Sequence, residues 1–527
     1  MNDRWVVRLD HHARLPPLGD AHRSSSGPGR CHASLSASSG TPELMIPEGH
    51  WSQRDWGLRI MLNETHTCQL RVSDDRRFLV RADGSPFSWF ADTAWELFHR
   101  LTREDAAYYL EKRVEQGFTL IQAVVLAEFE GIRQPNAYGN YALVEQDVTR
   151  PTEAYFRHVD WIVQKANHLG LVVGMLPTWG DKVGKTHGDG PTIFSEKSAR
   201  TYGEILGRRY READLVWILG GDRFVDDDEK RQIWRSLAEG LRTGDGGAHL
   251  MTFHPRGGDD AVSTSADVFP NTDPLLDFNM RQNGHSDRTK TWQRIADDYA
   301  RKPAKPVLDG EPLYEDHPIG FDAANQGYSN AHDVRRFLYL DLFAGAFGHT
   351  YGHHTVWQFH APERGDGVNQ PLGYWREALD SPGAGQVRHA RALLESRPFL
   401  NRIPDQSLVV PSTVPNAVPG TGTKRIGATR DADGRYGLVY SANSRKYAVG
   451  TDAITGDRIH CWWFNPRNGT HFDIGVFEKR SRVEVSPPCL GEDLDFVFVI
   501  DDAGQGFPAP GSGRSGPWEN EGKIRLL

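Results

Sequence analysis

The sequence of 527 residues contains little cysteine and no long apolar run. Its four cysteines (Cys31, Cys68, Cys461 and Cys489) form no CxxC pair, which excludes a zinc ribbon and a disulfide-dense fold. No run of about eighteen apolar residues occurs, so no segment has the composition of a membrane-spanning helix. We therefore expect no membrane partner.

The N-terminal segment also lacks the apolar core of a secretory signal peptide. Residues 1–60 are rich in Ser, Gly, Pro and Arg, and their few apolar residues follow no regular period. This composition predicts a disordered N-terminal extension. As written, the sequence predicts a cytoplasmic protein, with Met45 and Met61 as alternative translation starts.

The formal net charge of −9 is small for this length, and the Lys and Arg residues are scattered along the chain. Scattered positive charge argues against binding to nucleic acid or to an anionic membrane. No GxGxxG follows the first predicted strand, and neither a phosphate-binding loop nor a serine nucleophile elbow is present. We therefore expect no cofactor.

Aromatic and histidine residues are numerous, with 15 Trp, 16 Tyr and 22 His. Aromatic rings stack on the apolar faces of sugars, and His and Trp donate hydrogen bonds to hydroxyl groups. Core packing accounts for most of these side chains. The remainder favours a small-molecule or oligosaccharide substrate.

Short apolar strands alternate with amphipathic helices over residues 70–397. Continuous apolar strands of this kind are typical of a parallel sheet that helices cover on both faces. Eight candidate strands over about 310 residues predict an α/β fold, a (β/α)8 TIM barrel, in preference to an open doubly wound sheet. The candidate strands cover residues 88–92, 118–126, 171–177, 215–222, 249–255, 275–282, 306–312 and 349–359.

The pattern changes after Pro398, where helical periodicity stops and short alternating strands begin. Residues 436–442 and 495–501 are examples, and turn sequences such as 432–434 separate the strands. This pattern predicts a small C-terminal antiparallel β-sandwich over residues 398–503. Residues 504–527 are expected to form a loose tail.

Two carboxylates stand out among the polar residues that follow the barrel strands. Asp222 and Glu311 each come directly after a glycine, at the ends of the fourth and seventh strands. Active sites of barrels lie at these strand ends, and hydrolysis of a glycosidic bond needs one carboxylic acid and one carboxylate. The structural alternative is that each carboxylate caps a helix or pairs with an arginine, and Arg223 is adjacent to Asp222.

Other strand-end residues are candidates for binding a sugar. For Trp179 and Trp357 the alternative is packing in the barrel. A cluster of histidines near residue 353 suits hydroxyl recognition or core hydrogen bonds better than a metal, so we expect no metal site. The candidate substrate-binding residues are Asp92, Glu128, Trp179, His254, Gln282, Tyr314, His353 and Trp357.

Five segments resemble the apiosidase-like glycoside hydrolases, family 140. They are ADTAWELFHRLTREDAAYYLEKRVEQGFTLIQAVVLAEFEG (91–131), VVGMLPTWGDK (172–182), WILGGDR (217–223), LDGEPLYE (308–315) and GHTYGHHTVWQ (348–358). The C-terminal segment resembles the β-sandwich, named a putative collagen-binding domain, that commonly follows this barrel.

The resemblance implies a retaining, exo-acting mechanism in which Asp222 is the acid/base and Glu311 the nucleophile. It also implies release of a terminal β-apiosyl residue from a plant pectic side chain or another apiosylated glycoside. The missing signal peptide favours a small imported glycoside over extracellular pectin. Two alternatives remain open, namely action on another pentoside such as an arabinofuranoside, and a non-catalytic carbohydrate-binding protein. The sequence carries no sign of the oligomeric state.

Overall fold

The computed structural model of the chain describes residues 69–184, 190–257, 263–285, 290–412, 422–492 and 494–512. The predicted N-terminal extension (1–60) lies outside the described residues, as do residues 513–527 of the predicted tail. The described part of that tail is ordered on the sandwich, because the ring of Phe507 packs 6.2 Å from that of Tyr436. Within the described ranges, no helix combines the length and apolar character needed to cross a membrane.

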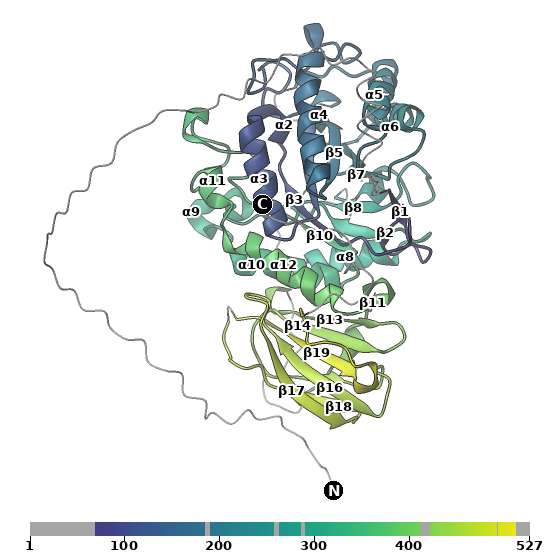
Figure 1. Cartoon of the computed structure of the whole chain (residues 1–527), viewed down its shortest axis with the longest axis vertical. Coiled ribbons are helices and arrows are strands. Elements are labelled where there is room, and N and C mark those ends of the chain that lie inside the picture. Colours follow the sequence, from purple (N-terminus) through teal and green to yellow (C-terminus); the bar gives the residue numbers. More distant parts are fainter. Residues whose placement is uncertain are drawn as a thin grey trace, which may run out of the picture. The chain divides into compact units, whose positions relative to one another are not determined.

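A ring of parallel strands forms the centre of the larger domain (Figure 1). Six strands pair in the order β10-β3-β4-β5-β6-β7, and β8 pairs with β9. Backbone hydrogen bonds join the two groups of strands, from Asp277 N to Met251 O (2.8 Å) and from Phe347 N to Val307 O (3.0 Å). The strands are β3 (Trp89–Thr93), β4 (Leu120–Leu126), β5 (Val172–Thr178), β6 (Leu215–Gly220), β7 (Met251–His254), β8 (Asn279–Arg281), β9 (Val307–Asp309) and β10 (Gly348–Tyr351).

Helices follow the strands and cover the outside of this ring (Figure 1), which confirms the predicted (β/α)8 barrel. Several of them begin at a side-chain cap; the hydroxyl of Thr102, for example, accepts the amide hydrogen of Asp105. A small hairpin of β1 (Leu70–Val72) and β2 (Leu79–Arg81) precedes the barrel. The helices are α2 (Leu97–Arg100), α3 (Arg103–Glu115), α4 (Glu153–His168), α5 (Glu196–Tyr210), α6 (Asp228–Asp245), α7 (Ser265–Val268), α8 (Thr291–Ala300), α9 (Ala323–Gln326), α10 (Ala331–Phe343), α11 (Trp375–Ala378) and α12 (Pro382–Glu395).

Side chains alternate between the inside and the outside of the barrel along each strand. In β3, Trp89 and Ala91 belong to the interior cluster, whereas Phe90 packs with the surrounding helices. The same alternation turns Asp92 outward. Six of the eight barrel strands are shorter than predicted; β8 and β9, for example, have three residues each where 275–282 and 306–312 were expected. β6 ends at Gly220 because the backbone turns there, and β10 ends at Tyr351 because residues 354–359 form turns.

The C-terminal domain is the predicted antiparallel sandwich. One sheet has the order β11-β13-β14-β19-β16-β17, and a smaller sheet has the order β12-β15-β18. Apolar residues such as Trp463 and Phe498 fill the space between the sheets. The strands are β11 (Arg402–Pro404), β12 (Val409–Val410), β13 (Ile426–Asp431), β14 (Tyr436–Ser441), β15 (Tyr447–Gly450), β16 (Arg458–Phe464), β17 (His471–Glu478), β18 (Arg482–Val485) and β19 (Phe496–Asp502).

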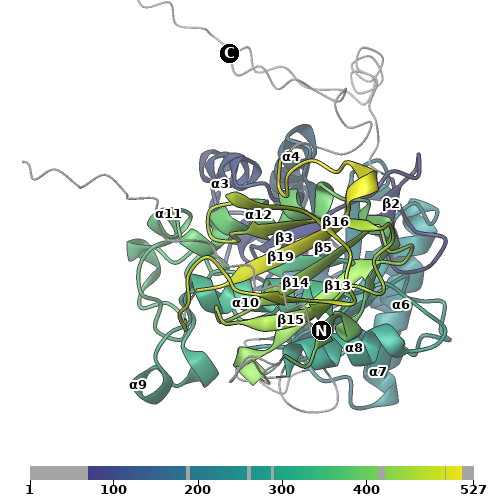
Figure 2. The ribbon, with the colours of Figure 1, turned by 90° about the horizontal axis from the view of Figure 1, so that it is seen from below.

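The larger sheet packs against α10 and α12 of the barrel (Figure 2). The rings of Tyr339 in α10 and Tyr440 in β14 stack with centroids 4.8 Å apart. Beside them, Arg335 forms a bidentate ion pair with Asp495, and both side chains are buried. Apolar contact and a paired charge therefore join the two domains through α10.

Candidate active site

A cavity of about 430 Å3 lies where the barrel strands end. Residues that follow β4, β5, β6 and β9 supply much of its wall, as expected when parallel strands point their carboxyl ends to one face. The lining residues are Trp95, Glu128, Phe129, Trp179, Asp222, Arg223, Arg256, Gly257, Gln282, Gly284, His285, Glu311, Tyr314, His317, Phe321, Trp357, Val368 and Asn369.

Glu311 lies two residues beyond β9 and is held between two imidazoles. Nε2 of His254 is 3.0 Å from Oε2 of Glu311, and Nε2 of His285 is 3.2 Å from Oε1. Burial by itself would raise the pKa of Glu311, but the contacts from His254 and His285 outweigh it and lower the pKa to about 2. Glu311 is therefore an ionised carboxylate at neutral pH.

The turn that presents Glu311 is held by Asp309, the last residue of β9. The carboxylate of Asp309 accepts the amide hydrogen of Glu311 (3.2 Å) and the side-chain amide of Asn283 (2.6 Å). Burial raises the pKa of Asp309 to about 6, although these hydrogen bonds act in the opposite direction. Asp309 thus positions the backbone under Glu311.

Asp222 lies on a turn that β6 enters through two glycines. Gly220, Gly221 and Asp222 all have positive φ, at 86°, 120° and 51°. A methyl group on Gly220 would overlap the carbonyl oxygen of His254, so glycine is required there for space as well as for conformation. Asp222 itself adopts a conformation that is strained for a non-glycine residue, which is common at functional sites.

The carboxylate of Asp222 has two hydrogen-bond donors beside it. The amide of Gly257 donates to Oδ1 (3.2 Å), and Nη1 of Arg223 donates to Oδ2 (3.2 Å). Burial and then the negative charge of Glu311 raise the pKa of Asp222, and they outweigh the opposing effect of Arg223. The two carboxylates of the cavity are therefore shifted in opposite directions.

A third carboxylate, Glu128, shares the same arginine. Nη2 of Arg223 pairs with Oε1 of Glu128 while Nη1 contacts Asp222. Burial raises the pKa of Glu128 to about 7, and the neighbouring charge of Asp222 adds to this effect. One guanidinium therefore stands between two carboxylates that both face the cavity.

Aromatic rings form the remaining walls. Trp95 and Trp179 pack 5.1 Å apart and lie 5.4 Å and 5.8 Å from the ring of His254. On the other side of Glu311, His285 stacks on His317 at 3.9 Å. The cavity thus combines flat apolar surfaces with carboxylates and imidazoles, the combination that binds sugars.

Residues 73–401 match the family model described as "Apiosidase-like, catalytic domain". The chain belongs to this apiosidase-like family. Residues 403–501 match the model described as "Putative collagen-binding domain of a collagenase". No curated protein matches the chain.

Solved glycoside hydrolases resemble this apiosidase-like chain over most of its length. A crystal structure of a family 5 glycoside hydrolase from Bacteroides vulgatus is 33% identical, has a TM-score of 0.74, and matches over 83% of this chain and 94% of that one. Another glycoside hydrolase is 33% identical with a TM-score of 0.73, over 83% and 98% of the two chains. A further structure, a putative glycoside hydrolase from B. vulgatus, is 16% identical with a TM-score of 0.59, over 84% and 83%, and shows the fold alone. The apiosidase-like chain is therefore a glycoside hydrolase.

The structure brings most of the candidate residues of this apiosidase-like hydrolase together. His254 contacts Glu311 without lining the cavity itself. Two candidates lie elsewhere. The carboxylate of Asp92 accepts hydrogen bonds from Arg113 and Tyr109 outside the strand ring, and Nε2 of His353 lies 3.3 Å from Asp316. The candidates that line the cavity are Asp222, Glu311, Glu128, Trp179, Gln282, Tyr314 and Trp357.

The cavity also contains several residues that were not among the predicted site residues. His285 and Arg256 follow predicted strands, so their positions could have suggested them. His317, Phe321 and Asn369 come from connecting segments, where no strand end marks them. Among the side chains that the structure describes, no group of three or more His, Cys, Asp or Glu is arranged to hold a metal ion.

Proposed function

We propose that this glycoside hydrolase is a retaining, exo-acting enzyme that releases a terminal pentofuranosyl residue, β-apiose, from a plant-derived glycoside or pectic oligosaccharide. The observation that carries the proposal is the opposite shift of two pKa values in one cavity, lowered for Glu311 and raised for Asp222. Two carboxyl groups shifted apart by their surroundings are the arrangement expected of a nucleophile and a general acid.

In the first step, the ionised Glu311 attacks the anomeric carbon of the bound sugar. Asp222 donates its proton to the glycosidic oxygen, and the aglycone leaves as an alcohol. His254 and His285 hold both oxygens of Glu311, which orients the carboxylate before the attack. The product of this step is a glycosyl–enzyme ester on Glu311.

In the second step, the now ionised Asp222 removes a proton from water, and the resulting nucleophile attacks the anomeric carbon. The ester bond to Glu311 breaks, Glu311 leaves as a carboxylate, and Asp222 is protonated again. The sugar departs with the configuration that it had in the substrate.

The cavity supports recognition of one terminal sugar. Its volume of about 430 Å3 lies at the lower end of the range of about 300–1,000 Å3 for small-molecule sites. Glu128 and Gln282 offer hydrogen-bonding groups for sugar hydroxyls, and Trp179 and Trp357 offer flat apolar faces. The choice of β-apiose among pentoses rests on the apiosidase-like family match.

The test is hydrolysis of 4-nitrophenyl β-D-apioside, of apiosylated flavonoid glycosides and of a panel of other pentosides. We expect the wild type to release apiose, and both Asp222→Ala and Glu311→Ala to lose at least about 1,000-fold in kcat/KM on the natural glycosides. Glu212→Gln, which removes an exposed charge of the barrel surface, is the matched control and should keep full activity.

The configuration of the product at the anomeric carbon distinguishes a retaining from an inverting mechanism. With azide, a retaining enzyme yields a β-glycosyl azide from Asp222→Ala and an α-glycosyl azide from Glu311→Ala, and proton NMR distinguishes the two. Release of inverted sugar by the wild type would contradict the retaining mechanism. Turnover of arabinofuranosides but not apiosides would move the substrate to another pentoside, whereas sugar binding without any turnover would support a non-catalytic role.

A further inference from the structure

One aromatic ring on the wall of the active-site cavity is exposed to solvent. Phe321 lines the cavity, yet 57% of its surface is accessible. It belongs to residues 317–328, here called the first mouth loop, and its backbone has a φ of 60°. This left-handed conformation costs free energy for a large side chain. Exposure, backbone strain and a place on the cavity wall together indicate that the ring of Phe321 contacts a ligand.

Two imidazoles pack against one side of the Phe321 ring. Its centroid lies 5.0 Å from that of His317 and 5.8 Å from that of His285, and the rings are close to perpendicular. His285 and His317 are themselves stacked, so two such similar distances place Phe321 beside the stack and not at its end. Because His285 also contacts Glu311, a single imidazole separates Phe321 from the proposed nucleophile.

Backbone hydrogen bonds hold the turn that carries Phe321. Across the first mouth loop, the amide of Ile319 donates to the carbonyl oxygen of Gly327 at 3.0 Å. The amide of Gly320 donates to the carbonyl oxygen of His285 at 2.9 Å, which ties the turn to the active site. The ring is therefore held in place before a ligand arrives, and binding to an ordered surface costs less entropy than binding to a mobile one.

A second mouth loop, residues 365–374, lies beside the first and is also held in place. The buried side chain of Gln358 accepts the amide hydrogen of Val368 (2.8 Å) and donates to the carbonyl oxygen of the same residue (3.1 Å). The hydroxyl of Tyr328, in the first mouth loop, donates to the carbonyl oxygen of Gln370 (3.1 Å). The two loops are therefore joined directly to each other.

The lining that the mouth loops provide is largely apolar. Phe321 offers a flat ring and Val368 an aliphatic surface, while Asn369 adds one amide group. Groups that suit sugar hydroxyls, such as those of Glu128 and Gln282, follow the barrel strands instead. An aryl ring gains from flat apolar contact alone, whereas a sugar ring also needs hydrogen-bond partners. The mouth therefore suits an aryl ring better than a second sugar.

We propose that the two mouth loops form a subsite for an aryl ring in the leaving group of the substrate, with Phe321 as the surface on which this ring stacks. The proposal rests on the proposed function, because it assigns the leaving group of that reaction. The terminal sugar lies at Asp222 and Glu311, and the rest of the substrate extends through the mouth of the cavity. The substrate class is then an aryl or arylalkyl glycoside, in preference to a pectic oligosaccharide.

The test compares the benzyl and the methyl β-glycoside of the sugar that the full chain releases, with apiofuranose as the first choice. Both leaving groups are alcohols of similar acidity, so a difference in kcat/KM reports contact with the ring. We expect the wild type to prefer the benzyl glycoside at least about tenfold, and Phe321→Ala to lose this preference. Phe321→Trp retains a flat ring and should retain the preference. An unchanged preference in Phe321→Ala would overturn the proposal.

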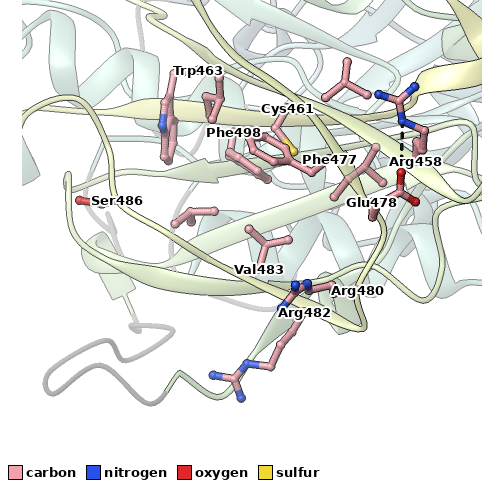
Figure 3. Close-up of a pocket in the computed structure, with 14 residues that line it drawn as sticks. Arg458, Cys461, Trp463, Phe477, Glu478, Arg480, Arg482, Val483, Ser486 and Phe498 are labelled. Atoms are coloured by element: carbon pink, nitrogen blue, oxygen red, sulfur yellow. Dashed lines mark ion pairs between the residues drawn. The ribbon is translucent and has the colours of Figure 1, made fainter. Parts of the chain in front are cut away.

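An apolar cavity in the sandwich supplies the matched control. It is lined by residues of both sheets, and Figure 3 shows Phe477 there with the buried side chains of Trp463 and Phe498. Phe477→Ala makes the same change of side chain as Phe321→Ala, away from the active site, and should leave both kcat/KM values at the wild-type level. A benzyl preference that is lost in Phe477→Ala as well would overturn the assignment of the aryl ring to the mouth loops.

Two further measurements separate a sugar leaving group from a failure of the proposed function. The methyl glycoside of apiosyl-(1→2)-glucose carries a sugar ring in place of the aryl ring; an equal preference for it, lost equally in Phe321→Ala, would overturn the aryl assignment. If the wild type hydrolyses no glycoside, the proposed function fails, and titration calorimetry tests the subsite by itself. The Kd of the benzyl glycoside should then be at least about tenfold lower for the wild type than for Phe321→Ala, and equal values would overturn the proposal.

Discussion

Nε2 of His254 lies 3.0 Å from Oε2 of Glu311, and the carbonyl oxygen of the same histidine accepts the amide hydrogen of Gly221 at 3.0 Å. One residue at the end of β7 therefore contacts the proposed nucleophile through its side chain and the turn before Asp222 through its backbone. This double contact fixes the two carboxylates with respect to each other.

Replacing His254 by alanine should move the acid limb of the pH profile. The two imidazoles lower the pKa of Glu311, so removing one raises that pKa towards the ordinary value of about 4.3. Because Glu311 must be ionised to attack, the acid limb of kcat/KM shifts to higher pH. We expect kcat/KM at the pH optimum to fall by about 10- to 100-fold, the size expected when one polar contact with a charged group is lost. An unmoved acid limb would contradict the assignment of Glu311 as nucleophile.

Glu128→Gln should move the alkaline limb of the pH profile of kcat/KM to lower pH. The substitution removes a negative charge near Asp222 and leaves Arg223 to act on Asp222 alone, so the pKa of Asp222 falls. Asp222 must hold its proton in the first step, and the alkaline limb of kcat/KM should therefore shift by roughly one unit to lower pH. Glu130→Gln, at a more exposed carboxylate that pairs with Arg133, is the control and should leave the limb in place. A shift to higher pH in the Glu128 variant would refute the argument.

Gly220→Ala should reduce both stability and activity. The positive φ and the overlap with the carbonyl of His254 cost about 1–3 kcal/mol in the free energy of unfolding. Displacement of Asp222 should lower kcat/KM by about 100-fold. Gly139→Ala is the control, because Gly139 has a similar φ of 75° but open space around it. Urea denaturation of this variant should show the cost of the backbone conformation, and its activity should equal that of the wild type.

Asp92→Asn should affect stability rather than catalysis. Asp92 and Arg113 are fully buried, and their side chains pair at 2.7 Å, so removing one charge leaves the other without compensation. We expect the free energy of unfolding to fall by about 3–5 kcal/mol with little change in KM. Asp380→Asn breaks the exposed pair with the neighbouring Lys112 and should cost less than about 1 kcal/mol. A large rise in KM with unchanged stability would contradict this prediction and would support a role of Asp92 in binding the sugar.

The barrel fold and the position of Asp222 and Glu311 at strand ends could be predicted, because apolar runs in the sequence mark the strands and the residues at which they end. The apolar runs before Asp222 and Glu311 end at glycines, and parallel strands bring such ends to one face. Asp92 follows the same rule of position, but strand alternation points it to the helices, and the sequence does not show which face is inside. His317 and Phe321 reach the cavity from a long connection whose path depends on tertiary packing. Arg223 illustrates another limit. Its pairing with Asp222 was considered as a structural alternative because the two residues are adjacent, but its contact with Glu128 joins residues 95 positions apart.

Helix α10 is buried along eleven consecutive residues, from Asp333 to Phe343. A barrel helix normally keeps one face in water, and here the sandwich occupies that face through Tyr440 and Asp495. The C-terminal domain consequently acts as part of the barrel's shell and not as an appended module. A barrel expressed alone would expose to water a strip of apolar and charged groups that the sandwich covers in the full chain, and it would tend to aggregate. Another domain in place of the sandwich would have to cover the same strip of α10. The barrel and the sandwich therefore have to be engineered together, as one unit.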